Sequence, residues 1–210
     1  MIPMNYDKIV LDDHDIREGV YKRYFGGGAQ EWERRGLFQL HLLQARGLRR
    51  DCRLFDIGCG PLRAGVHFIH FLEPGNYCGI DSNISFIKAA RQIVAHSNDL
   101  EDRSPVLDVS RNFLPPKTVT APFDFGIAFS VLNHCTDAQR AQFFANAPAA
   151  FHQRSRIILT HCGKWFHKSY LEGSHLEVAK VLEQSSFYGW GLGGTIFPII
   201  ELRLRSVLEL

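Results

Sequence analysis

The chain has 210 residues, of which 45% are hydrophobic and 22% are charged. This is the composition of a folded globular protein, and it excludes a chain that is disordered throughout. The 24 basic and 22 acidic side chains give a formal charge of only +2, without the dense positive charge of a surface that binds nucleic acid. The length predicts a single domain over residues 1–210.

Membrane, secreted and metal-cluster proteins are also disfavoured. The longest stretch without a charged side chain, residues 184–200, contains four glycines and a proline, which is not typical of a membrane span. Aspartates occur near the N-terminus, where a secretory signal would be apolar. The five cysteines include no C-x-x-C pair, so neither a zinc nor an iron–sulfur site is indicated. We therefore expect a cytoplasmic protein with free thiols, no metal, and neither a nucleic acid nor a membrane as partner.

Strands and helices alternate along the first half of the chain. Residues 1–30 are irregular or weakly helical. The following elements are a helix over 31–45, a strand over 53–57, a helix over 64–71, a strand over 77–81 and a helix over 84–94. Ser82 or Asn83 is expected to cap the last of these helices. This alternation predicts a doubly wound α/β fold, in which helices cover both faces of a parallel sheet.

The second half continues the alternation with weaker signals. We expect strands over 105–108, 123–129 and 156–160, a helix over 137–151 that Pro148 shortens, and a helix over 174–183. In the tail, apolar residues starting at Ile200 alternate with charged residues starting at Glu201. Residues 200–210 are therefore predicted to form a strand at or near a sheet edge, with one solvent-exposed face. No confident strand is found between the last helix and this tail.

The most informative stretch is a glycine loop that follows the first predicted strand. Asp56, Gly58 and Gly60 lie between that strand and a helix, and Asp81 ends the second strand, 21 residues beyond Gly60. Glycines let the backbone approach a ligand, and a carboxylate at this place can accept hydrogen bonds from two ribose hydroxyls. The third glycine of a dinucleotide-binding loop is replaced by Arg63, and no phosphate loop is present. The pattern indicates a nucleoside ligand without phosphates.

Three segments together resemble class I S-adenosylmethionine-dependent methyltransferases. These are Asp56-Ile57-Gly58-Cys59-Gly60, Gly79-Ile80-Asp81, and the stretch from Phe123-Asp124 to Phe129-Ser130-Val131-Leu132. The similarity covers roughly residues 31–162. It implies a mostly parallel sheet of about seven strands with one antiparallel strand near the C-terminus, which the alternating tail would supply. It also implies three regions: an N-terminal extension or lid (1–30), a cofactor-binding core (31–162), and a substrate-side and C-terminal strand region (163–210).

The resemblance implies which residues would contact S-adenosylmethionine, whose product is S-adenosylhomocysteine. They are Asp56, Gly58, Cys59, Gly60, Arg63, Asp81, Ser82, Asp108, Ser130 and Val131. The glycine loop would line the methionine part, and Arg63 would pair with its carboxylate. Asp81 and Ser82 would hold the ribose, and Asp108 would lie near the adenine amino group. The last two residues would border the sulfonium and the substrate.

Methyl transfer from a sulfonium is an in-line displacement, in which a general base helps if the acceptor must lose a proton. His134, after the fourth predicted strand, is the first candidate for this base, and His161, after the fifth, is the second. His167 is a weaker candidate. Each histidine could instead only shape the pocket. The alternative interpretation of these side chains is a metal site formed by Cys135, His161, Cys162 and His167. Their spacing matches no familiar zinc pattern.

The acceptor is expected to be a small molecule, with oxygen favoured over nitrogen as its methylated atom. The segment Ser130-Val131-Leu132-Asn133 lacks the Asn/Asp-Pro-Pro-aromatic motif of family members that methylate nucleobases. The main alternative is a binding module of the same fold without turnover. A nicotinamide oxidoreductase is disfavoured by Arg63. The glycine- and aromatic-rich stretch 185–197 is a candidate for closing the pocket or for contacting a second copy, which leaves a homo-oligomer open.

Overall fold

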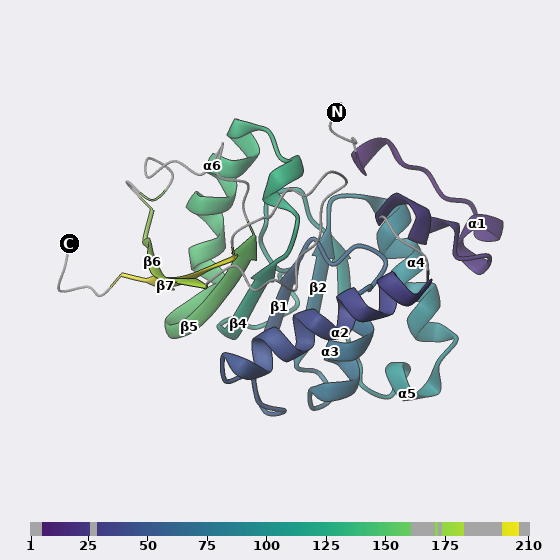
Figure 1. Cartoon of the computed structure of the whole chain (residues 1–210), viewed down its shortest axis with the longest axis horizontal. Coiled ribbons are helices and arrows are strands. Elements are labelled where there is room, and N and C mark those ends of the chain that lie inside the picture. The colour runs from purple at the N-terminus through teal and green to yellow at the C-terminus, as the bar shows by residue number, and fades with distance from the viewer. Residues whose placement is uncertain (1–5, 26–28, 161–170, 172–173, 183–198, 206–210) are drawn as a thin grey trace.

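The computed structural model describes residues 6–25, 29–160, 171, 174–182 and 199–205 (Figure 1). Its centre is a seven-stranded sheet with the order β3-β2-β1-β4-β5-β7-β6. The strands are β1 (Leu54–Ile57), β2 (Tyr77–Asp81), β3 (Val106–Val109), β4 (Phe123–Ala128), β5 (Phe151–Thr160), β6 (Leu176–Leu182) and β7 (Ile199–Leu204). The pairs among β1 to β5 are parallel, and β7 is antiparallel to both β5 and β6. The expected doubly wound sheet with a reversed C-terminal strand is confirmed.

Helices pack on both faces of this sheet, and each face has its own apolar core. The longer helices are α2 (Ala29–Ala45), α3 (Gly65–Phe71), α4 (Ile84–Ala95) and α6 (Asp137–Asn146), and α5 (Asn98–Glu101) is a single turn. Leu43, Phe68 and Ile87 bring α2, α3 and α4 onto one face, whereas Phe143 and Phe144 bring α6 onto the other. Of the helices in the described part of the chain, none has the length and apolar character that crossing a bilayer requires.

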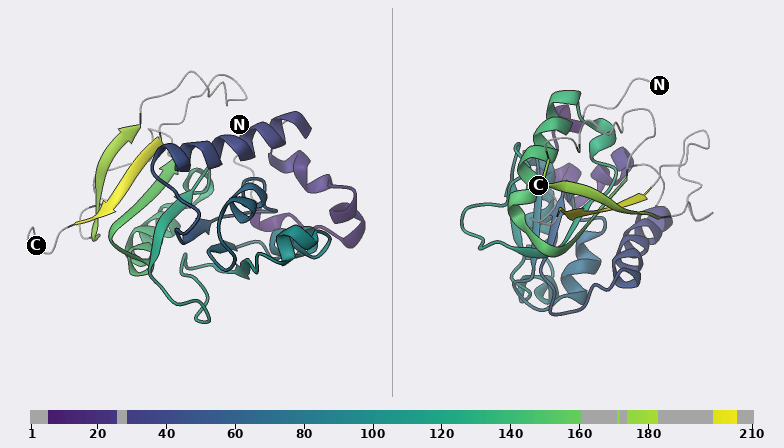
Figure 2. Two further views of the ribbon diagram at one scale, coloured as in Figure 1. Left: turned by 90° about the horizontal axis from the view of Figure 1, so that it is seen from below. Right: turned by 90° about the vertical axis from the view of Figure 1, so that its left-hand side faces the viewer.

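The N-terminal segment forms a third, smaller cluster at one end of the molecule. It consists of η1 (Tyr6–Lys8), α1 (Asp13–Arg17) and η2 (Val20–Phe25), where η denotes a short 3-10 helix. Leu11, Ile16 and Tyr21 from this segment pack with Trp32 of α2 and Phe86 of α4. Figure 2 shows that this segment lies at the opposite end of the molecule from β6 and β7.

Most expected elements are present, with boundaries that local signals explain. Asn83 caps α4, because its side-chain oxygen accepts hydrogen bonds from the amides of Ser85 (2.7 Å) and Phe86 (3.3 Å). The helix expected over 137–151 ends at Asn146 and gives way to η4 (Ala147–Ala150), which contains Pro148. The strand expected from residue 156 begins five residues earlier, at Phe151.

The helix expected over residues 174–183 is wrong, because this segment contains the edge strand β6. Val178 and Val181 favour a strand, and the segment pairs with β7 from Leu176 to Leu182, apart from an irregularity between Val178 and Lys180. This is the strand that could not be located from the sequence. Periodicity alone did not separate a short helix from a strand here, and pairing with a partner strand decided the outcome.

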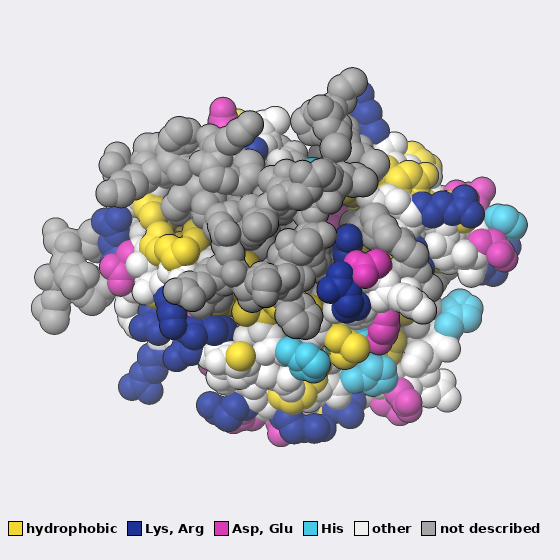
Figure 3. Space-filling model, viewed as in Figure 1, with side chains coloured by type: hydrophobic (Ala, Val, Ile, Leu, Met, Phe, Trp, Pro, Cys, Tyr) yellow, Lys and Arg dark blue, Asp and Glu magenta, His cyan; other side chains and the backbone are white. Residues whose placement is uncertain are grey.

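The expectation of a solvent-exposed charged face on the tail strand holds for Arg203 but is wrong for Glu201, which is fully buried. β7 lies between β5 and β6 in the sheet. Three arginines surround the Glu201 carboxylate. Arg46 Nε donates to Glu201 Oε2 at 2.7 Å, Arg203 donates to Oε1 at 3.2 Å, and Arg156 Nε lies 3.8 Å from Oε1. Figure 3 shows basic side chains gathered at this end of the molecule. The ion pairs connect the end of α2 to the second half of the sheet.

Candidate functional site

The glycine loop after β1 turns sharply across the end of β2. The amides of Gly58 and Cys59 both donate to the carbonyl oxygen of Ile80, at 2.7 and 2.9 Å. Gly58 has φ +78° and Gly60 has φ +54°, which are left-handed values that glycine adopts at little cost. A Cβ atom on Gly58 would lie 2.4 Å from Val131 Cγ2. The loops after β1 and β4 therefore meet at Gly58.

Asp81, at the carboxyl end of β2, is oriented by two backbone amides. Gly60 N donates to Asp81 Oδ2 at 3.0 Å, and Asn83 N donates to Oδ1 at 2.8 Å. The side chain is partly exposed, as is neighbouring Ser82. A carboxylate can accept about four hydrogen bonds, so the two amides orient the group without exhausting its capacity for ligand hydroxyls.

Asp56 and Cys59 line the buried side of the same loop. Tyr77 Oη donates to Asp56 Oδ2 at 2.7 Å. Burial raises the pKa of Asp56 to about 7, so this carboxyl titrates near neutrality. Burial, with Asp56 and Asp81 nearby, raises the pKa of the Cys59 thiol well above its usual range. Cys59 is therefore a neutral packing group rather than a nucleophile.

Arg63 follows the glycine loop and contacts α2 from two directions. Its guanidinium carbon lies 6.0 Å from the centroid of the Trp32 ring. Its carbonyl oxygen would lie 2.2 Å from a Cβ atom on Gly36, so this glycine permits a close approach between α2 and the loop. The pairing of Arg63 with a methionine carboxylate stays a prediction.

Asp108 lies near the carboxyl end of β3, next to the strand that carries Asp81. The register pairs Asp108 with Ile80, and Val109 with Asp81. Asp108 Oδ1 accepts a hydrogen bond from Val109 N at 2.9 Å and lies 3.5 Å from an Arg91 nitrogen. The structure thus brings Asp108 to the same edge as Asp81, with its carboxylate already engaged.

The end of β4 carries a strained residue. Ser130 has φ +61°, an unfavourable value for a residue with a side chain, and its amide donates to Thr160 Oγ1 at 2.7 Å. Thr160 ends β5 and is 2% exposed. Val131 follows, and its side chain lies against Gly58 of the glycine loop. The sequence gives no signal for the part that Thr160 plays.

His134 ends η3 (Leu132–His134), a short helix after β4. Its ring lies edge-on to the ring of Tyr6, with centroids 4.6 Å apart. Although the residue as a whole is exposed, the packed ring is desolvated, and burial lowers the pKa of His134. The imidazole is therefore neutral at pH 7 and able to accept a proton. His161, Cys162 and His167 lie outside the described residues.

The N-terminal segment reaches the site through Asn83, a residue expected only as a possible helix cap. Asn83 Nδ2 donates to the carbonyl oxygens of Tyr6 (2.6 Å) and Ile9 (2.8 Å). Leu11 N donates to Ser85 Oγ at 3.2 Å. With the ring contact between Tyr6 and His134, these hydrogen bonds hold the N-terminal segment against both the start of α4 and the loop after β4.

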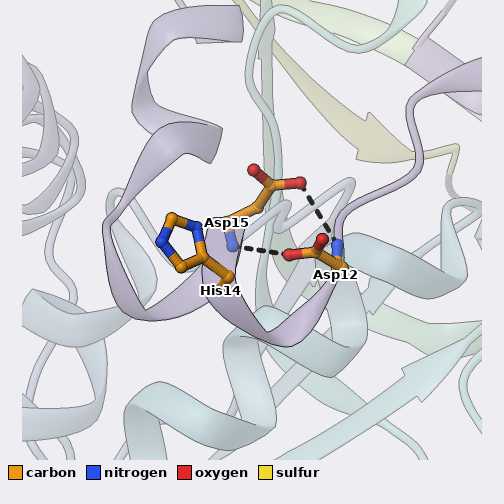
Figure 4. A group of neighbouring side chains, drawn as sticks. All are labelled: Asp12, His14 and Asp15. Carbon is orange, nitrogen blue, oxygen red and sulfur yellow. Dashed lines mark hydrogen bonds between the residues drawn. The ribbon is translucent and has the colours of Figure 1, made fainter.

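A cluster of potential metal ligands, Asp12, His14 and Asp15, lies at the start of α1 (Figure 4). Their ligand atoms lie within 4.8 Å of one another. The two aspartates form a capping box: Asp15 N donates to Asp12 Oδ1 at 2.7 Å, and Asp12 N donates to Asp15 Oδ2 at 3.3 Å. Helix capping explains this exposed arrangement without an ion.

Comparisons with known proteins give structural matches only. A scan against family models and a search of curated proteins found no match. Magnesium protoporphyrin IX methyltransferase (ChlM) from Synechocystis PCC 6803, solved with bound S-adenosylmethionine, has a TM-score of 0.63 at 19% identity, and the match covers 97% of this chain and 100% of that one. For the glycopeptide N-methyltransferase MtfA the values are 0.64 and 12%, covering 80% and 90%.

The mitomycin 7-O-methyltransferase MmcR has a TM-score of 0.63 at 17% identity, and the match covers 92% of this chain and 58% of that one. These proteins share the overall fold of this chain but little of its sequence. The order β3-β2-β1-β4-β5-β7-β6 with a reversed β7, together with these matches, shows that the chain has the class I S-adenosylmethionine-dependent methyltransferase fold.

Proposed function

We propose that the chain is an enzyme that transfers a methyl group from S-adenosylmethionine to a small-molecule acceptor, with oxygen favoured over nitrogen. The observation that carries this proposal is the Asp81 carboxylate, held by the amides of Gly60 and Asn83 beside a glycine loop. On this fold, ligands bind at the carboxyl ends of the strands.

Two features of this edge support the proposed cofactor. The positive φ values of Gly58 and Gly60 give the loop a tight turn beside Asp81, whose carboxylate offers acceptors for ribose hydroxyls. Asp108, on the neighbouring strand β3, is the proposed partner of the adenine amino group. When bound, S-adenosylmethionine supplies a methyl group that its sulfonium already activates, so the protein mainly aligns the acceptor with the donor.

His134 is the proposed general base. His134 lies in the loop after β4, which also contains Ser130 and Val131, the residues proposed to border the donor. Its lowered pKa leaves the imidazole neutral at physiological pH. An oxygen acceptor gains most from such a base because a hydroxyl must lose its proton during transfer. His161 remains the second candidate for this role.

The N-terminal segment is proposed to act as a lid. It is fixed to α4 by Asn83 and meets the loop after β4 through Tyr6 and His134, so it borders both the donor side and the acceptor side. A closed lid would exclude water and hold the acceptor near the donor. A small acceptor is supported by the names of the structural neighbours, which refer to a porphyrin, a glycopeptide and mitomycin.

The first experiment measures donor binding. S-adenosylmethionine and S-adenosylhomocysteine are titrated into the wild type and into Asp81→Ala by calorimetry. We expect Asp81→Ala to weaken binding about 100-fold, because a charged hydrogen-bonding group to the ribose is lost. The matched control is Asp99→Ala, which removes the same group from an exposed position on α5. Unchanged affinity in Asp81→Ala would contradict the proposed site.

The second experiment separates an enzyme from a binding module without turnover. The protein is incubated with a labelled methyl donor and a library of small metabolites, and products are identified by mass. Formation of S-adenosylhomocysteine at a rate that depends on an acceptor supports the enzyme. Tight donor binding without any acceptor-dependent turnover supports the binding module.

A further inference from the structure

Tyr77 is buried at the start of β2, yet its hydroxyl reaches the beginning of the glycine loop on the neighbouring strand. The residue is 2% exposed, and its ring stacks on Phe68 of α3 with centroids 6.4 Å apart. Its Oη donates to Asp56 Oδ2 at 2.7 Å. Since the register places Tyr77 beside Leu54, the side chain runs along the sheet toward Asp56, two residues further along β1.

Two glycines leave room for this phenol. A Cβ atom on Gly79 would lie 2.9 Å from Tyr77 Oη and 3.0 Å from Cys59 Sγ. A Cβ atom on Gly65, the first residue of α3, would lie 2.7 Å from the same oxygen. Neither glycine has a left-handed φ, so a turn does not explain them. The Tyr77 hydroxyl occupies space that a side chain at either position would need, and at Gly65 Leu62 Cδ2 also lies in the way, 2.4 Å from the added Cβ.

The surroundings of Asp56 determine its pKa, and the hydrogen bond from Tyr77 favours the ionised form of this carboxyl. Burial is the main reason that the pKa of Asp56 rises to about 7, and the bond from Tyr77 is the main opposing influence. Asp81 raises the pKa further, and Arg63 lowers it. Burial raises the pKa of the Cys59 and Cys78 thiols as well, so these neighbours stay neutral. Without the phenol, the ionised carboxylate would lose its hydrogen-bond donor.

We propose that Tyr77 is a positioning residue for the methyl donor: its hydroxyl holds the Asp56 carboxylate in place beneath the glycine loop, where this carboxylate favours a cationic ligand. The inference rests on the proposed function, because the donor carries a positive sulfonium and a positive ammonium group. It assigns a role to a strand residue whose side chain lies behind the loop.

The test measures the affinity for S-adenosylmethionine by calorimetry between pH 5.5 and 8.5, in the absence of any acceptor. We expect wild-type affinity to fall as the pH drops through about 7, because Asp56 then takes up a proton. In Tyr77→Phe the carboxyl loses its donor, so its pKa rises and the midpoint of this fall moves to higher pH. Affinity at pH 7.5 is expected to drop about tenfold. Asp56→Asn should abolish the dependence on pH.

The matched control is Ser155→Ala, which removes the hydroxyl of another buried side chain, one that donates to the carbonyl oxygen of Phe123 at the start of β4. Thermal denaturation of each ligand-free variant reports on folding separately. A Tyr77→Phe curve that superimposes on the wild-type curve across this pH range would overturn the inference, whatever its stability, while leaving the proposed function intact. Absence of binding by the wild type at every pH would overturn both.

Discussion

The two halves of the sheet's carboxyl edge are built in different ways. After β1 and β2, the site is held within one strand-helix-strand unit, where the amides of Gly60 and Asn83 both donate to the Asp81 carboxylate. After β4 and β5, positions depend on distant partners: Ser130 on Thr160, and His134 on Tyr6. We call the loops after β1 to β3 the proposed donor half and the loops after β4 and β5 the proposed acceptor half. The proposed donor half follows from a sequence motif. The proposed acceptor half depends on tertiary contacts that no motif specifies.

Removing the proposed base should have the largest effect, and it should be confined to the acceptor half. We expect His134→Ala to lower kcat by about 10²–10⁴, the usual contribution of general-base catalysis, with donor affinity unchanged. Because burial lowers the pKa of His134, wild-type kcat should stay constant from pH 9 down to the ordinary histidine range near 6.5 and fall below it. Initial rates at saturating donor, measured across pH, provide the check.

His134→Phe is the matched control because it keeps an aromatic ring against Tyr6 but removes both nitrogens. Equal loss in the Ala and Phe variants supports proton transfer by the imidazole. Full activity in His134→Phe would show that the ring only packs against the N-terminal segment.

The contact between the halves can be broken at Gly58. In Gly58→Ala the new Cβ would lie 2.4 Å from Val131 Cγ2, and the residue would keep an unfavourable φ of +78°. We expect donor affinity to fall about 100-fold and stability to drop by about 1–3 kcal/mol. Gly75→Ala is the control, since it has nearly the same φ, +81°, but no atom within 4 Å of its Cβ. Equal destabilisation and unaltered binding in both would show that only backbone strain matters.

Within the acceptor half, Thr160→Val removes the oxygen that accepts the Ser130 amide while keeping the side-chain shape. We expect kcat/KM for the acceptor to fall about tenfold and the donor Kd to stay the same. Ser130→Gly relieves the left-handed strain and should restore part of the activity when combined with Thr160→Val. Loss of donor binding in Thr160→Val would mean that the two halves are not separable.

The smallest expected effect is a gain in stability in the donor half. Folding raises the pKa of Asp56 to about 7, so the folded state holds this proton after the unfolded state has released it, and stability is lost as the pH rises from the ordinary carboxyl range to about 7. Asp56→Asn removes that loss. Its Tm should exceed the wild-type Tm by about 5 °C at pH 8, and the difference should shrink toward pH 5. Asp99→Asn, the same change at an exposed position, should show no such pH dependence.

The same contrast explains how much could be predicted from the sequence. The glycine loop, Asp81 and the first three strands follow from residue types at short spacing, because glycine and strand propensities act locally. The segment 174–183 has no such signal: its apolar residues suit a helix or a strand, and pairing with β7 selected the strand. Glu201 was expected in solvent because alternation does not show which arginines will cover it.

The N-terminal segment has a consequence for the order in which the protein assembles. Tyr6 and Ile9 are synthesised early, but their partner Asn83 requires β2 and α4, and the ring partner of Tyr6 requires the chain after β4. During translation the N-terminal segment therefore cannot make these contacts until much of the sheet has been synthesised. The first described residues of the chain can therefore reach their final places only after the chain as far as His134 has been synthesised.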